Sequence, residues 1–106
     1  MAKYMVSASY TVEGTKGLIK DGGSARRAAV QKAIEGLGGR LECFYFTLGD
    51  QDAFAIVEVP DDVMIAAASL AINATGGAHV TTKVLLTPEQ IDEAVKKSVS
   101  YRAPGA

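Results

Sequence analysis

Two apolar stretches separated by four residues constrain the fold of this chain more than any other feature. Residues 40–48 and 53–59 are rich in β-branched and aromatic side chains, and only residues 49–52, Gly-Asp-Gln-Asp, lie between them. So short a connection joins antiparallel strands, which predicts a β-hairpin. Glycine adopts positive φ angles and aspartate hydrogen-bonds its own backbone, and both properties favour a turn. We therefore expect Asp50 and Asp52 to fold the hairpin, since the turn supplies too few oxygen ligands for a metal.

Strand and helix patterns alternate along the rest of the chain. Apolar and polar side chains alternate with a period of two over residues 3–11 and 79–87, which predicts two further strands. Helices are predicted over residues 24–37 and 62–74, where capping residues precede them and glycine pairs end them. A third helix is predicted from Pro88, where the sequence Thr-Pro-Glu-Gln has the pattern of a capping box.

The predicted order, β-α-β-β-α-β with an added C-terminal helix, is that of the ferredoxin-like split βαβ arrangement. This is an α+β fold in which helices cover one face of an antiparallel sheet. A chain of 106 residues buries one core without a metal or a disulfide, so we expect a single domain over residues 1–106. The glycine-rich residues 12–23 are expected to form a loop with, at most, a short helical turn near residues 16–20. Residues 99–106 are expected to form an extended tail.

Composition and charge exclude several classes of partner. The formal net charge is -1, whereas a protein that neutralises nucleic-acid phosphates needs a strongly basic face. Cys43 is the only cysteine, so no disulfide forms within the chain and a reducing compartment is expected. The N-terminal residues lack the apolar core of a signal peptide, and no run approaches the ~20 apolar residues of a membrane span. We expect a cytoplasmic protein with neither a nucleic-acid nor a membrane partner.

Apolar side chains are predicted on both faces of the central strands, and helices cover only one of these faces. Over residues 63–74, moreover, the predicted helix carries no charged side chain at all. A monomer rarely exposes so much apolar surface, so we expect a homo-oligomer, most simply a two-fold dimer through the uncovered face. The alternative is that residues 12–23 and the tail cover these surfaces within one chain. In the strand over 40–48, strict alternation predicts that one face carries Leu41, Cys43 and Tyr45. The opposite face is predicted to carry Phe44, Phe46 and Leu48.

The hairpin also carries a family resemblance. Its sequence, FYFTLGDQDAFAIVEVPDD, resembles the signature of the bacterial GYD-domain family, in which Gly-x-Tyr-Asp joins two apolar strands and Pro-Asp-Asp follows. Gly49 and Asp52 match the ends of that pattern, whereas Gln51 stands in the place of the tyrosine. Further agreements are the segments TVEGTKGLIKDGGSARRAAV, LGGRL and VLLTPEQ, so the resemblance spans nearly the whole chain. It implies a ferredoxin-like fold of the dimeric α+β-barrel type and little about function, and it carries over no aromatic role to Gln51.

Two side chains are candidates for acid–base chemistry. His79 is the only histidine, and an imidazole titrates near neutral pH. Glu58 is the one acid in an otherwise apolar strand, where burial would raise its pKa and where Lys83 or Arg40 would supply an ion-pair partner. The alternative is that Glu58 forms such an ion pair and has a purely structural role. No second histidine and no cysteine accompany His79 at the spacing of metal ligands, and we expect neither a metal nor another cofactor.

Arg26 is the leading candidate for ligand binding. Its position four residues before Val30 places it on the apolar side of the helix over 24–37, near the N-terminal end. A guanidinium beside the free N–H groups of a helix start can bind a carboxylate or a phosphate. Alternatively, its stem packs on the core while the head group reaches water. A cleft between this helix and the sheet would also be lined by Tyr10, Tyr45 and Lys20. For the two tyrosines, the alternative is packing in the core or in an interface.

Three hypotheses for the function follow. The first is a homo-oligomer that binds a small anionic or aromatic metabolite in the cleft beside Arg26 without catalysis, because no nucleophile and base are assembled in the sequence. The second is an enzyme, by analogy with dimeric α+β barrels that catalyse monooxygenase and isomerase reactions, with His79 or Glu58 as the acid–base group. The third is a structural oligomer that binds no ligand.

Overall fold

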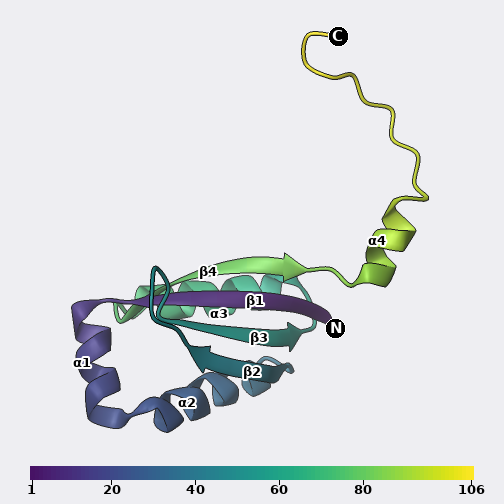
Figure 1. Cartoon of the computed structure of the whole chain (residues 1–106). Helices are drawn as coiled ribbons and strands as arrows, with labels where there is room; N and C mark the ends of the chain where they lie inside the picture. The colour runs from purple at the N-terminus through teal and green to yellow at the C-terminus, as the bar shows by residue number, and fades with distance from the viewer.

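One four-stranded antiparallel sheet with its two long helices on a single side makes up the body of the chain (Figure 1). The computed structural model describes residues 1–106. In chain order, the elements are β1 (Ala2–Tyr10), α1 (Val12–Asp21), α2 (Gly23–Gly36), β2 (Arg40–Phe46), β3 (Ala53–Val59), α3 (Asp62–Ala74), β4 (Ala78–Leu85) and α4 (Pro88–Ala94). The predicted ferredoxin-like α+β fold, the hairpin and the C-terminal helix are therefore confirmed, with strand and helix ends that differ by one or two residues.

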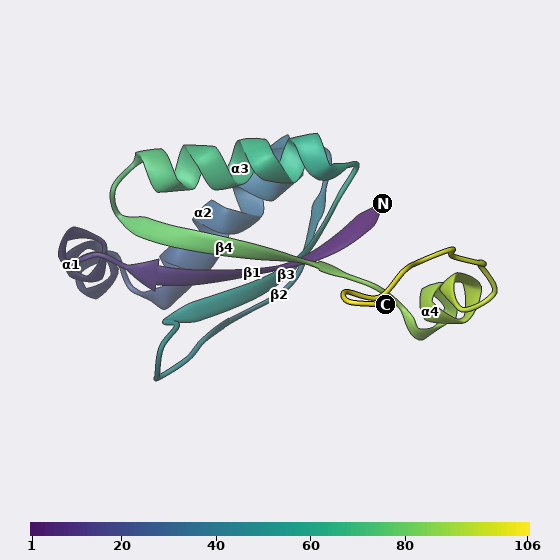
Figure 2. The same ribbon diagram turned by 90° about the horizontal axis from the view of Figure 1, so that it is seen from above.

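The strand order is β2-β3-β1-β4, and each neighbouring pair is antiparallel. Because β1 lies between β3 and β4, this is the split arrangement, and β2 and β4 form the two edges of the sheet. Tyr4 of β1 lies opposite Val57 of β3 and Val84 of β4, so these three side chains share one face. The helices α2 and α3 lie over that face (Figure 2). We call the uncovered side the open face; its central side chains are Met5, Cys43, Tyr45, Phe54 and Ile56.

The core lies between the helix-covered face of the sheet and the helices α2 and α3. Tyr4 is at its centre, and its hydroxyl donates a hydrogen bond to the carboxylate of Asp62 in the first turn of α3. This bond fixes the start of α3 on the sheet. Only nine of the 106 residues are buried, so one copy of the chain has a small core. The contiguous cluster of buried side chains consists of Tyr4, Ile34, Ala55, Val57, Val59 and Ile65.

A β-bulge in β2 changes which of its side chains face the core. Leu41 lies opposite Val57, but Cys43 lies opposite Ile56, so one residue, Glu42, is extra in β2. Leu41 therefore packs against the core, as Phe44 does, while Cys43 is on the open face. The expectation that Leu41 and Cys43 share a face is wrong, because it assumed unbroken alternation along the strand. Leu48 lies beyond the end of β2 and is exposed.

Residues 12–21 form a helix, α1, where the sequence predicted a loop with a short helical turn. Thr11 caps this helix, since its side chain accepts a hydrogen bond from the N–H of Gly14 at 3.1 Å. Gly22, with a φ of 85°, separates α1 from α2. The glycines that suggested a loop are accommodated within α1, at Gly14 and Gly17. The prediction was wrong because glycine weakens a helix without excluding it when tertiary contacts require a small residue.

The C-terminal residues project away from the sheet. We call residues 86–106 the arm; it contains α4 and the extended tail predicted from the sequence, which has neither helix nor strand from residue 99 (Figure 1). Every residue of the arm is exposed, and the molecule measures 55 × 34 × 23 Å. None of the helices is both long enough and apolar enough to cross a bilayer.

Candidate functional site

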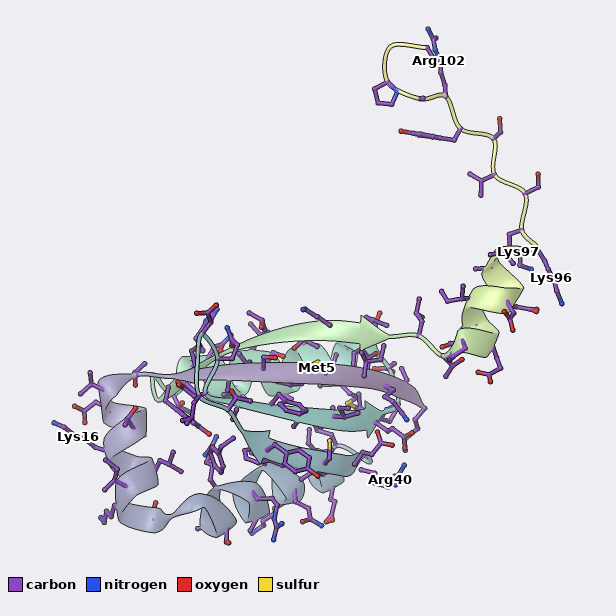
Figure 3. The ribbon with its side chains drawn as sticks, viewed as in Figure 1. Met5, Lys16, Arg40, Lys96, Lys97 and Arg102 are labelled. Carbon is purple, nitrogen blue, oxygen red and sulfur yellow. The ribbon has the colours of Figure 1, made fainter.

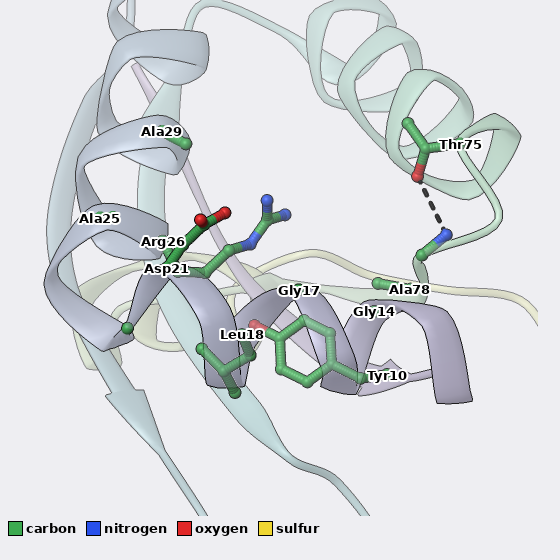
Figure 4. Close-up of a pocket in the computed structure, with 12 residues that line it drawn as sticks. Tyr10, Gly14, Gly17, Leu18, Asp21, Ala25, Arg26, Ala29, Thr75 and Ala78 are labelled. Atoms are coloured by element: carbon green, nitrogen blue, oxygen red, sulfur yellow. Dashed lines mark hydrogen bonds between the residues drawn. The ribbon is translucent and has the colours of Figure 1, made fainter.

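A cavity of about 230 Å³ opens where α1, α2 and the turn before β4 meet at one end of the sheet (Figure 4). Its wall consists of Tyr10 at the end of β1, one side of α1, the first turns of α2 and residues 75–78. Thr11 holds α1 in place, because its backbone N–H and its hydroxyl donate hydrogen bonds of 3.1 and 2.8 Å to the carbonyls of Gly77 and Gly76. The helix that the sequence did not predict therefore forms one wall of the cavity.

Arg26, near the start of α2, lines this cavity and two adjoining ones. The second, of about 50 Å³, lies between the helices and the sheet, and the third, of about 410 Å³, lies between α2 and α3. Figure 4 shows the side chain of Arg26 pointing from α2 toward the space beside α3. Its Nε is buried without a hydrogen-bond partner, and its guanidinium forms no ion pair. A buried donor without an acceptor costs about 1–3 kcal/mol, so this position favours a molecule that brings an acceptor.

The surroundings of Arg26 combine positive charge with apolar surface. Of the 17 residues that line the smallest of the three cavities, 15 are hydrophobic, among them Val6, Phe44 and Ile72. The N-terminus of α2 has no side-chain cap and no acid in its first turn, so its free N–H groups keep their positive partial charge. Asp21 is the one acid in the wall of the first cavity, of about 230 Å³, which we call the outer cavity, and it forms no ion pair with Arg26. The site can therefore hold an anionic group next to an apolar one.

The hairpin turn supports this site from outside. The backbone N–H of Tyr10 donates a 2.8 Å hydrogen bond to Oδ2 of Asp52, and the N–H of Asp52 donates one of the same length to the carbonyl of Ala8. Asp52 thus connects the turn to the end of β1 and fixes the residue that lines the cavity. Asp52 therefore has a structural role, but its carboxylate accepts a hydrogen bond from β1 and not, as predicted, from the backbone of the turn itself.

Comparison with known families identifies the chain. The family model of the GYD domain matches residues 4–95. The chain belongs to the GYD domain family. The match runs from β1 to one residue beyond α4, and so includes every element that lines the cavity of this GYD domain. No curated protein matches the sequence.

Of the four residues predicted to line a ligand site in this GYD domain, the structure brings together two, Arg26 and Tyr10. Lys20 is exposed in the last turn of α1 and does not line the cavity. Tyr45 lies on the open face, where its ring packs against that of Phe54 with the centroids 5.8 Å apart. The sheet itself therefore separates Tyr45 from Arg26.

The two candidate acid–base residues lie far from each other on the open face. Glu58 is in register with Lys3 of β1 and His79 with Ser9, so six residues of strand separate them, or about 20 Å. Arg26 lies on the other side of the sheet, among the helices. Neither candidate lines the cavity, so the three residues do not meet at one site within a chain. No three side chains of His, Cys, Asp or Glu form a group that could hold a metal ion.

Glu58 is an ion-pair residue in this fold. Nη2 and Nε of Arg40 donate hydrogen bonds of 2.8 and 3.1 Å to its Oε2, and Nζ of Lys3 lies 3.9 Å from its Oε1. The hydrogen bond from Arg40 lowers the pKa of Glu58 below its usual value, more than partial burial raises it. The expectation of a raised pKa was wrong, whereas Arg40 was correctly named as a partner. His79 is exposed at the other end of the same face.

Sequence reasoning missed Thr75, Gly77 and Asp21 as parts of the cavity wall. They come from the end of α3, the turn before β4 and the end of α1, which lie far apart in the chain. The glycine pair at 76–77 was interpreted only as the end of a helix. Such a pair also permits two backbones to approach closely, and this was the available signal that α1 packs there.

Proposed function

We propose that this GYD domain is a homo-oligomer that binds a small organic anion at Arg26 without catalysing a reaction on it. The observation that carries the proposal is the Nε of Arg26, buried without an acceptor at the junction of three cavities. A carboxylate or phosphate would accept hydrogen bonds from the guanidinium, and charge-assisted bonds of this kind are about twice as strong as neutral ones.

The shape of the site favours an anion with an apolar or aromatic body. The cavity between α2 and α3 has about 410 Å³, within the range of roughly 300–1,000 Å³ of small-molecule sites, and seven of its nine lining residues are hydrophobic. Its walls include Val30 of α2 and Ile72 of α3. A ligand whose acidic group meets Arg26 can therefore place its body between the two helices.

The open face supports self-association. Met5 and the side chains of β2 and β3 make its centre apolar, and charged or polar residues surround them: Arg40, Glu58 and Lys3 at one end, Ser9 and His79 at the other, and Ser7, Thr81 and Lys83 on the side of β4. An apolar centre with a polar rim is the usual anatomy of a protein interface. Figure 3 shows Met5 in the middle of this face and Arg40 at its end. A two-fold dimer through the open face would leave the cavities at Arg26 accessible, since they lie on the other side of the sheet.

The test compares two neighbouring arginines of α2. Native mass spectrometry of freshly purified protein reports the subunit number and any retained small molecule, and calorimetric titration with benzoate, 4-butylbenzoate and inorganic phosphate measures affinity for defined probes.

Arg26→Met keeps the length of the stem but removes the charge, and we expect it to lose the retained molecule and to weaken 4-butylbenzoate binding by about 10- to 100-fold. Arg27→Met, at an exposed position outside the three cavities, is the control and should bind as the unmodified chain does. Equal affinity of the two variants would contradict the anion site.

A further inference from the structure

The arm, residues 86–106, is built to pack against another surface and meets none within its own chain. Its apolar side chains Ile91, Val95, Val99 and Tyr101 are 48%, 76%, 80% and 67% exposed. Figure 2 shows α4 and the tail beyond the end of β4, clear of the helices that cover the sheet. Figure 3 places Lys96, Lys97 and Arg102 along the arm, far from Met5 in the centre of the sheet.

The arm has a defined structure with one apolar side. α4 has seven residues and a complete capping box between Thr87 and Gln90. So short a helix is marginal in water by itself, so a stable α4 needs a surface to pack on. Ile91 and Val95 are four residues apart and share one side of the helix. In the extended residues that follow, Val99 and Tyr101 alternate with serines, which is the pattern of a strand with one apolar side.

The edge strand β2 is a surface that fits such an arm. As the last strand of the sheet it has an unpaired backbone edge, and it exposes Tyr45 and Phe46 at 60% and 42%. Two shallow hollows of about 330 and 310 Å³ run along it, and Arg27 of α2 lines both. Arg27 forms no ion pair, while α4 carries three acids, Glu89, Asp92 and Glu93. The acids of α4 are therefore complementary to Arg27, whereas the arm as a whole is balanced in charge, since Lys96, Lys97 and Arg102 follow the three acids.

The area of the open face also leaves room for a further contact. Four strands ~4.8 Å apart and seven to nine residues long make a face of roughly 19 by 26 Å. Two such faces together bury about 1,000 Å², below the ~1,200–2,000 Å² of a stable interface. If the two-fold axis of a pair runs along the strands, β4 of one copy lies over β2 of the other. The arm that leaves β4 then begins beside the free edge of the second copy.

We infer that the arm of one copy packs along the β2 edge of a second copy, with residues 98–102 added to that edge as a strand and α4 directed toward Arg27. Both arms of a two-fold dimer make this contact reciprocally. The inference rests on the self-association in the proposed function and is independent of the anion site. The combination of an edge strand and an extended partner with alternating apolar side chains is the known mode of strand addition.

Photo-crosslinking in the full chain tests this. Tyr101 is replaced by p-benzoylphenylalanine, ¹⁵N-labelled and unlabelled copies are mixed and allowed to exchange, and crosslinked peptides are identified by mass. We expect crosslinks from position 101 to residues 40–47 that join a labelled to an unlabelled copy. The same photoreactive residue in place of the exposed Ile19 of α1 is the control and should give no crosslink to that strand. Crosslinks only within one copy, crosslinks to another region, or none in a sample that sediments as a dimer would each overturn the inference.

A second measurement uses sedimentation equilibrium of the variant Val99→Asp with Tyr101→Asp. The arm lies outside the core, so we expect an unchanged fold by circular dichroism and a dimer Kd raised at least about tenfold. Val12→Asp, which changes an equally exposed valine on α1, should leave the Kd unchanged. A variant that dimerises like the unmodified chain contradicts the arm contact alone. An unmodified chain that stays monomeric at about millimolar concentration contradicts the proposed self-association as well.

Discussion

Gly14 of α1 lies against the carbonyl of Gly77, so close that a β-carbon on Gly14 would be 1.8 Å from the carbonyl oxygen. The same carbonyl accepts a hydrogen bond from the N–H of Thr11. This contact joins α1 to the turn between α3 and β4, and both glycines line the outer cavity. The position of α1, and with it one wall of the proposed ligand site, therefore depends on the absence of a side chain at residue 14.

Alanine at residue 14 should destabilise the fold. Gly14→Ala must displace α1 from the backbone of Gly77, and we expect the free energy of unfolding to fall by about 1–3 kcal/mol. Gly17→Ala is the matched control on the same helix, because a β-carbon there has no atom within 4 Å. It should raise the free energy of unfolding by up to ~1 kcal/mol, since alanine favours a helix over glycine. Urea denaturation of both variants measures the difference; a change of the same sign in both would contradict the close contact.

The hydrogen bond between Tyr4 and Asp62 should make stability depend on pH in the alkaline range. The bond to the carboxylate, burial and the charges of Asp62 and Asp61 raise the pKa of Tyr4 to about 12. The unfolded chain releases this proton near pH 10, so the contribution to stability is present below that pH and is lost as the pH rises toward 12. Tyr4→Phe should be less stable at pH 8 and should lose less stability between pH 10 and 12. Denaturation curves at several pH values check this, and an equal alkaline loss in both proteins would refute it.

The ion pair between Arg40 and Glu58 should stabilise the fold except in acid. Because the folded-state pKa of Glu58 is lowered, its contribution is present above the unfolded pKa of about 4.5 and is lost as the pH falls through the lower folded value. Arg40→Met should raise the pKa of Glu58, as measured by the NMR titration of its carboxyl carbon. Lys3→Met should raise it less, since Nζ of Lys3 is 3.9 Å from the carboxylate against 2.8 Å for Arg40. The reverse order of the two shifts would assign the pairing to Lys3.

Arg26→Met should separate ligand binding from stability. The substitution removes a buried Nε that has no acceptor, and an apolar side chain of similar length fills the same space. We therefore expect an unchanged or slightly raised melting temperature for the ligand-free protein, together with the loss of anion binding. Thermal unfolding after extensive dialysis gives the first quantity. A clear loss of stability would show instead that the guanidinium supports the fold.

Local signals in the sequence predicted most of the architecture. The four-residue turn after Leu48 fixed the hairpin, and Thr87 and Gln90 formed the expected capping box, because these structures depend on residues adjacent in the chain. The helix α1 was missed because Gly14 serves a contact with Gly77, which is remote in the sequence. Arg26 was placed on the correct side of its helix by periodicity. Its cavity could not be predicted, since Thr75 and Asp21 reach it only through tertiary packing.

The extra residue at Glu42 decides the chemistry of two surfaces at once. Upstream of it, Arg40 joins the ion pairs of the open face; downstream of it, alternation is reset, so that the thiol of Cys43 faces outward and the ring of Phe44 faces the helices. Had the strand instead continued past Glu42 in strict alternation, the two sides of everything from Cys43 to Phe46 would be exchanged, with a thiol and a phenol in the hydrocarbon interior and two phenyl rings in solvent. Deletion of Glu42 would remove the bulge and keep both surfaces as they are, because Leu41 and Cys43 would then be neighbours that face opposite ways.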